Sequence, residues 1–95
     1  MTHRTYQITP RDVTLGDGWN LKLFEDEQPA GGGVFPVPNE ESSMGMNWWN
    51  SLTEDARAHW LMMAASAIPA AARHAFLLAE TYEEAQAQGD DWIGL

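Results

Sequence analysis

Hydrophobic and polar residues alternate over the first third of the chain, most clearly between residues 19 and 23. Trp19, Leu21 and Leu23 are separated by single polar residues. This period of two is typical of a strand with one buried and one solvated face. We expect these three side chains to face the helices and the intervening Asn20 and Lys22 to face water.

Two weaker patterns flank this strand and complete a predicted antiparallel sheet. Tyr6 and Ile8 alternate with polar neighbours until Pro10 interrupts the run, as in a short edge strand. We predict that residues 13–15 extend the first strand and that residues 16–18 form a glycine turn. We predict a hairpin loop over residues 25–29 and the return strand over residues 31–37.

The triple glycine at residues 31–33 has two interpretations. A phosphate-binding loop needs glycines between a strand and a helix N-terminus, usually with a lysine. Here the glycines lead into a strand, and no lysine is near. We therefore favour a β-bulge, or close approach of an aromatic ring such as Trp19 or Trp48 to bare backbone.

A helical period replaces the alternation after residue 43. We predict a short helix over residues 44–52, a second helix capped by Thr53, and a third that begins at Pro69 and runs to about Gln88. Gly89 is a candidate C-cap for the third helix, and continuation through Trp92 is the open alternative. The predicted buried stripe of this helix, with Phe76 at its margin, is Ala71, Ala75, Leu78, Ala79, Tyr82 and Ala85.

Residues 48–63 contain three of the five tryptophans and two of the five methionines. We expect this segment to be a hub on which the sheet and the long helix both pack, with Trp60 the best-buried tryptophan. Strands precede helices, which predicts the α+β class: a three-stranded antiparallel sheet against two or three C-terminal helices. We expect one domain over residues 1–95, β-rich over 5–37 and helical over 44–93.

The net charge of the chain limits the kinds of molecule that we expect it to bind. Fourteen acidic and five basic residues give a formal charge of −9. Neutralising nucleic-acid phosphates requires clustered basic residues, so we expect no direct nucleic-acid contact. An acidic surface suits a protein partner with a basic surface, or serves solubility alone. The chain has no cysteine, no leader-like segment and no long apolar run, so we expect a cytoplasmic protein without membrane contact.

Catalytic and metal-binding patterns are weak. His59 and His74 lie on different predicted helices, and neither has a second histidine or a carboxylate four residues further along. Asp55 lies four residues before His59, a spacing that more often makes a surface helix pair than a set of metal ligands. The serines lack a nucleophile-elbow pattern, and no cysteine is present. We expect no cofactor, no metal site and no enzymatic activity.

The candidate binding residues are an aromatic pair and two acidic pairs. Tryptophan is enriched in interface hot spots, and one of two adjacent indoles is expected to be partly exposed. Adjacent acids on a helix point about 100° apart, so they suit a charged surface better than an acid–base dyad. The predicted protein-binding residues are Trp48, Trp49, Glu83, Glu84, Asp90 and Asp91.

Five segments resemble short accessory proteins of proteobacterial plasmids and integrative elements: residues 18–26, 31–36, 48–52, 78–82 and 89–92. The resemblance implies a mobile genetic element and carries no site residues across. Small acidic proteins of such elements sometimes inhibit restriction or CRISPR systems, which implies a non-enzymatic inhibitor of a host nucleic-acid-handling defence protein. The alternatives are a small enzyme or ligand-binding domain with a site between sheet and helices. A homodimer also stays open.

Overall fold

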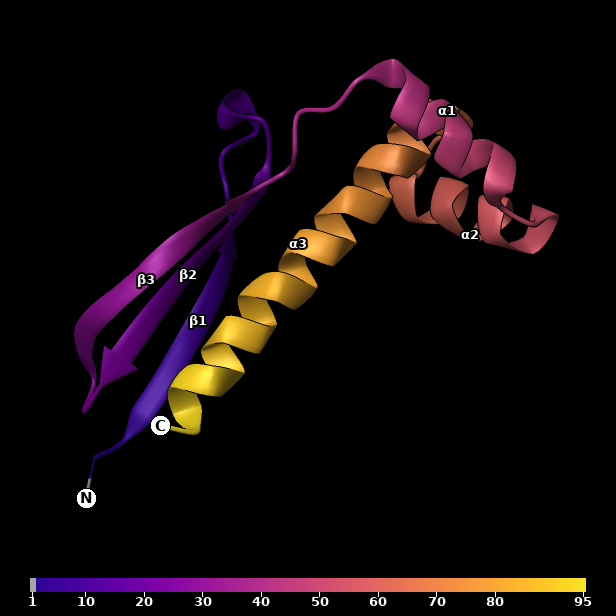
Figure 1. Cartoon of the computed structure of the whole chain (residues 1–95). Helices are drawn as coiled ribbons and strands as arrows, with labels where there is room; N and C mark the ends of the chain where they lie inside the picture. Colours follow the sequence, from indigo (N-terminus) through magenta and orange to yellow (C-terminus); the bar gives the residue numbers. More distant parts are fainter. Residues whose placement is uncertain (1) are drawn as a thin grey trace. The chain divides into compact units, whose positions relative to one another are not determined.

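The computed structural model describes residues 2–95, which form two compact units. The sheet unit contains the residues up to Val37 together with Glu80–Leu95, and the helical unit is Pro38–Ala79. The long helix α3 (Pro69–Ile93) contributes to both units. A three-stranded antiparallel sheet precedes three helices, which confirms the predicted α+β class (Figure 1).

The sheet has the order β1-β2-β3, with the most regular strand in the middle. Its strands are β1 (Arg4–Pro10), β2 (Gly18–Glu25) and β3 (Gln28–Pro36). Leu21 is only 2% exposed while Lys22 is exposed, so the predicted facing of β2 is confirmed at these positions. Trp19 lies edge-on to Tyr82 of α3, with ring centroids 4.9 Å apart.

Residues Val13–Leu15 form a 3₁₀ helix, so their prediction as an extension of the first strand was wrong. The cause is the side chain of Asp12, whose Oδ1 accepts a hydrogen bond from the Thr14 backbone N–H at 2.9 Å. A cap of this kind competes with strand pairing. Gly16 then ends the helix in the left-handed region at φ 96°, which confirms the predicted turn.

The glycine run of β3 is explained by backbone packing. The pairing with β2 shifts register between Leu23 and Phe24, immediately beside the glycine run, and Gly31 adopts φ 128° there. A Cβ on Gly32 would lie 2.1 Å from the carbonyl oxygen of Leu21. The run therefore admits close approach of the neighbouring strand. An aromatic ring does lie next to the run, but it is that of Phe35, 3.5 Å from a Cβ placed on Gly33, and not that of Trp19 or Trp48.

The last turns of α3 attach to the sheet through contacts of Tyr6 and Trp92. The ring of Tyr6 packs on Gly89, where an added Cβ would come within 2.6 Å of the ring. The Tyr6 hydroxyl donates to Oδ1 of Asp90 at 2.9 Å. The indole N–H of Trp92 donates to the carbonyls of Thr5 and Phe24, each at 3.1 Å. In Figure 1 this part of α3 runs along β1.

The predicted end and buried stripe of α3 both need correction. The helix continues through Trp92 to Ile93, which confirms the open alternative, so Gly89 is a packing residue and no C-cap. Of the predicted stripe only Ala85 is fully buried, and Tyr82 is 38% exposed. The fully buried positions of α3 are Ala72, Leu77, Thr81, Ala85 and Gly89. Gly89 and Thr81 are buried because the side of α3 that packs on its neighbours is determined by tertiary contacts, such as that of Gly89 with the Tyr6 ring, and not by hydrophobicity alone.

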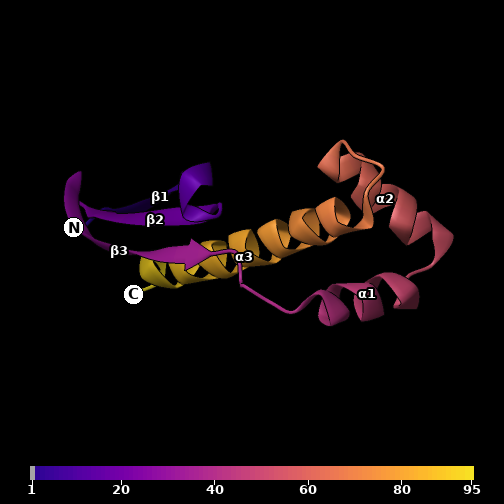
Figure 2. The same ribbon diagram turned by 90° about the horizontal axis from the view of Figure 1, so that it is seen from above.

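The helical unit contains α1 (Ser42–Ser51), α2 (Glu54–Ala64) and the first turns of α3. Figure 2 shows α1 and α2 beside those turns. Thr53 caps α2 as predicted, accepting from the Ala56 N–H at 3.2 Å. The helix ends at Ala65, which is left-handed at φ 50°.

An aromatic cluster of Trp48, Trp60 and Phe76 forms the centre of the helical unit. Phe76 lies 5.0 Å from Trp48 and 5.2 Å from Trp60 between ring centroids. All five tryptophans are half-buried, so Trp60 does not occupy a sealed core position. Met63 of α2 is 60% exposed and does not belong to this cluster.

Candidate functional site

The predicted acidic residues all lie on the sheet unit's part of α3, and all are exposed: Glu83, Glu84, Asp90 and Asp91. Asp90 has a structural contact as well, because its carboxylate accepts the Tyr6 hydroxyl. This hydrogen bond raises the pKa of Tyr6 above its usual value. Ten acidic and three basic residues belong to the sheet unit, a formal charge of −7.

The predicted aromatic pair lies in the other unit, and its two members have different surroundings. Trp48 has ring neighbours in Trp60 and Phe76, and the guanidinium of Arg73 lies 5.2 Å from its ring centroid. Trp49 has the Trp48 ring at 6.4 Å and the guanidinium of Arg57 at 5.2 Å from its ring centroid, and it also lines a pocket, which Trp48 does not. Trp48 is therefore mainly a packing residue, and Trp49 is the better candidate for contact with another molecule.

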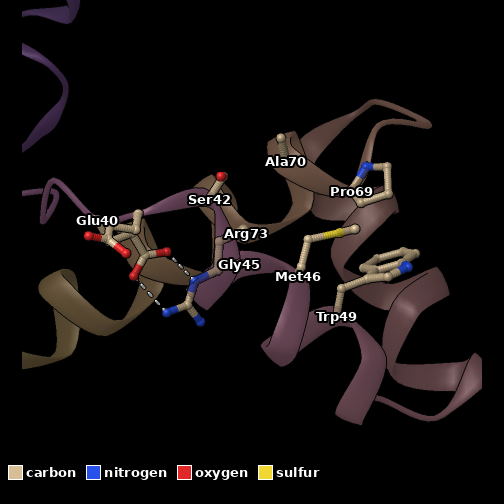
Figure 3. A pocket seen from close by; sticks show the side chains of 9 residues that line it. Glu40, Ser42, Gly45, Met46, Trp49, Pro69, Ala70 and Arg73 are labelled. Atoms are coloured by element: carbon tan, nitrogen blue, oxygen red, sulfur yellow. Dashed lines mark hydrogen bonds and ion pairs between the residues drawn. The ribbon is translucent and has the colours of Figure 1, made fainter.

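The pocket beside Trp49 has a volume of about 360 Å³ and is mostly apolar (Figure 3). We call it the Trp49 pocket. It is bounded by the segment before α1, one side of α1, and the first turn of α3. Its lining residues are Glu40, Glu41, Ser42, Gly45, Met46, Trp49, Pro69, Ala70 and Arg73. Ligand pockets begin at about 300 Å³, so a side chain or small molecule fits here.

An ion pair forms one end of the Trp49 pocket. Arg73 donates from Nε to Oε1 of Glu40 at 2.7 Å and from a terminal nitrogen to Oε2 at 2.9 Å, and both side chains are 16% exposed. These hydrogen bonds hold the pKa of the Glu40 carboxyl below its usual value. The pair attaches the segment before α1 to α3 and fixes the shape of the pocket.

Several methionines of the helical unit are exposed. Met46 lines the Trp49 pocket and is 61% exposed. Other large apolar side chains of this unit are equally exposed: Met44, Met62, Met63 and Ile68. A second, shallower hollow of about 390 Å³ is lined by Met63, Ala64, Ala71, His74, Ala75 and Leu78. Methionine is flexible and polarizable, so such a surface adapts to an apolar partner.

The sequence-based selection of candidate residues missed most of the pocket. Glu40 and Arg73 are 33 residues apart, and no local pattern connects them. Met46 and Trp49 are three residues apart on one predicted helix, a spacing that places them on one side. This spacing was the only indication in the sequence that the two side chains lie together, and both line the pocket.

Metal ligands do not gather in the part of the chain that the structure describes. Over residues 2–95, no group of three or more histidine, aspartate or glutamate side chains is arranged to hold a metal ion. The His59 ring lies edge-on to Trp60, 4.8 Å between centroids, and His74 lines the second hollow.

No protein-family model, curated protein sequence or solved structure matches this chain. Within residues 2–95, no single helix is long and apolar enough to cross a membrane. Only α2 and α3 taken together reach that length and composition, and they are bent by 81° at the break between them.

Proposed function

We propose that this chain is a non-enzymatic accessory protein that binds a protein partner through its helical unit. The observation that carries the proposal is the Trp49 pocket, an apolar recess between an indole and a 61% exposed methionine. Exposed apolar side chains that gather around a recess are typical of interaction sites, because soluble proteins rarely expose large apolar patches without a function. Tryptophan and methionine are also enriched in interface cores.

Charge supports a partner with a basic surface. The chain carries −9, and its four arginines already make contacts within the molecule. Arg4 and Arg57 lie over Trp92 and Trp49, Arg11 donates to the carbonyl of Leu15, and Arg73 pairs with Glu40. Negative charge therefore dominates the field that an approaching protein meets. The resemblance to accessory proteins of mobile elements suggests a host nucleic-acid-handling defence protein as this partner.

The test is capture of a partner from a proteobacterial lysate by the immobilised chain, compared between two variants. Met46→Glu places a charge at the mouth of the Trp49 pocket. Met62→Glu makes the same change on α2 at a residue that is 71% exposed and does not line this pocket. The proposal expects the wild type and Met62→Glu to retain the same protein and Met46→Glu to lose it. Equal retention by all three would contradict the proposal.

The second candidate is a ligand-binding domain, which the volume of the Trp49 pocket favours. The pocket lies within the helical unit, whereas the sequence-based alternative placed a site between sheet and helices. A small ligand would stabilise the folded chain against heat without any protein partner. A melting-temperature rise with a small molecule, lost in Met46→Glu and kept in Met62→Glu, would favour this candidate.

A further inference from the structure

We infer that the Trp49 pocket receives the side chain of a lysine or arginine from the partner protein. This inference rests on the proposed function and specifies the chemistry of the contact. Lysine and arginine have an apolar stem and a charged end. The pocket offers surfaces of both kinds, arranged along one recess.

The stem of such a residue matches the apolar part of the pocket. Met46, Pro69 and Ala70 line it together with the Trp49 indole. Burying the methylene groups of the stem against them removes apolar surface from water, which is favourable. An indole face also attracts a cation, and the Trp49 ring already has one such neighbour within the chain, the guanidinium of Arg57 at 5.2 Å from the ring centroid.

The charged end of the residue matches the acidic rim. Three charged side chains line the pocket: Glu40, Glu41 and Arg73. Glu40 and Arg73 are joined by two hydrogen bonds and balance each other. Glu41 is exposed, and although it is the N-cap residue of α1, its side chain makes no capping hydrogen bond. Among the side chains that line the pocket, Glu41 is therefore the one whose charge is not balanced by an ion pair, and a carboxylate at the rim favours a cationic end group over a neutral or acidic one.

The second hollow lacks this combination. Its lining residues carry no carboxylate, and they are alanines, Met63, His74 and Leu78. An apolar side chain would suit that hollow equally well, so it indicates no particular occupant. The rim carboxylate is what distinguishes the Trp49 pocket.

The experiment is an NMR titration of the ¹⁵N-labelled chain with two peptides that share their stems and differ in charge. The probes are hexalysine and hexalysine with every side chain acetylated. Indole N–H signals are assigned with single Trp→Phe variants. We expect hexalysine, but not its acetylated form, to shift the Trp49 indole and the Gly45 amide saturably. Glu41→Gln should weaken this binding about two- to fivefold, the range for one exposed ion pair.

Glu84→Gln is the matched control, because it removes one exposed charge from the sheet unit. It should leave the Trp49 titration curve within a factor of about 1.5 of wild type, because charges beyond a Debye length of about 8 Å are screened. Equal weakening by Glu41→Gln and Glu84→Gln would overturn the inference. So would shifts at Trp92 and Gly89 without any at Trp49.

This outcome is distinguishable from failure of the proposed function. If Met46→Glu loses the partner while hexalysine leaves the Trp49 indole unmoved, the basic-side-chain inference fails and protein binding stands. If Met46→Glu keeps the partner, the proposed function itself fails.

Discussion

The sheet unit and the helical unit are held together by different kinds of contact. In the sheet unit, backbone atoms and glycines make the close approaches: Gly32 against the Leu21 carbonyl, and Gly89 against the Tyr6 ring. In the helical unit, half-buried aromatic rings surround Phe76, and large methionines stay exposed. The close backbone packing of the sheet unit leaves almost no room for an added atom, whereas the half-buried side chains of the helical unit can rearrange.

Charge follows the same division. The sheet unit carries −7 of the chain's −9, and the helical unit carries the remaining −2. A strongly acidic surface attracts a basic partner over a distance, while an adaptable apolar surface makes the close contact. Under the proposed function, the sheet unit would attract the partner and the helical unit would make the close contact. The comparison of the two units also predicts how each unit responds to substitution.

The largest expected effect is in the helical unit. Trp60→Ala removes the ring that packs edge-on against Phe76 and should cost about 3 kcal/mol, the lower part of the range for tryptophan because Trp60 is only half-buried. Hydrogen exchange should show faster opening of α1 and α2 than of the sheet. The control is Met62→Ala, at an exposed position on the same helix. A melting point within a few degrees of wild type would disprove the importance of this cluster.

A smaller effect is expected from one methyl group in the sheet. Gly32→Ala places a Cβ 2.1 Å from the Leu21 carbonyl oxygen, so the strands must separate, at a cost of about 2 kcal/mol. Gly33→Ala is the matched control, because the nearest atom to its Cβ is a ring carbon of Phe35 at 3.5 Å, an ordinary contact. Chemical denaturation of both variants checks the difference. Equal stability of the two would mean that β2 and β3 adjust freely.

The indole N–H of Trp92 allows a third test, which compares the opening of the sheet unit with that of the helical unit. Trp92→Phe keeps a ring beside the sheet but removes the donor to the Thr5 and Phe24 carbonyls, which should cost about 1 kcal/mol. Exchange of amides in β1 and the end of β2 should accelerate, while α1 and α2 stay unchanged. Acceleration throughout the helical unit would show that the two units open together.

The Glu40–Arg73 pair predicts a pH-dependent term within the helical unit. The pKa of Glu40 is lower in the folded chain than in the unfolded one, so its contribution is present near neutral pH and is lost as the pH falls through its folded-state pKa. Glu40→Gln should therefore be less stable than wild type near neutral pH, and the difference should shrink below about pH 4. Urea midpoints at several pH values measure it. A difference independent of pH would rule out the ion pair as its source.

The smallest effect is expected on the acidic surface of α3. Glu83→Gln and Glu84→Gln remove exposed carboxylates and should change the free energy of unfolding by less than about 0.5 kcal/mol per site. Their effect should appear in the rate of association with a partner and in its dependence on salt. If the double variant associates as fast as wild type with the same salt dependence, these charges serve solubility alone.

The predictable parts of the fold are those determined by neighbouring residues. The alternation of β2 placed Leu21 inside, and Thr53 and Pro69 marked the starts of two helices correctly. The 3₁₀ helix after β1 was missed because one Asp12 side chain bonds the backbone two residues on. The buried face of α3 was missed because that face contains Gly89 and Thr81, which a hydrophobicity pattern does not select.

The candidate site was less predictable for a similar reason. Trp48 and Trp49 stood out by residue type alone, but their different surroundings depend on where Phe76 and Arg73 arrive in space. The ion pair at the pocket joins Glu40 to a helix 33 residues away. A single sequence contains no record of such a contact.

The division of the chain also has a consequence for the order in which it folds during synthesis. The helical unit is one continuous segment, whereas the sheet unit joins residues on both sides of it. The contact of Trp92 with Thr5 spans 87 positions, and that of Asp90 with Tyr6 spans 84. On a ribosome, the first strands emerge long before their helical partner is made. We therefore expect α1 and α2 to gain structure first, while one face of the sheet stays uncovered until the end of α3 is made. During that time the prolines of the two edge strands, Pro10, Pro29 and Pro36, would limit pairing with other chains.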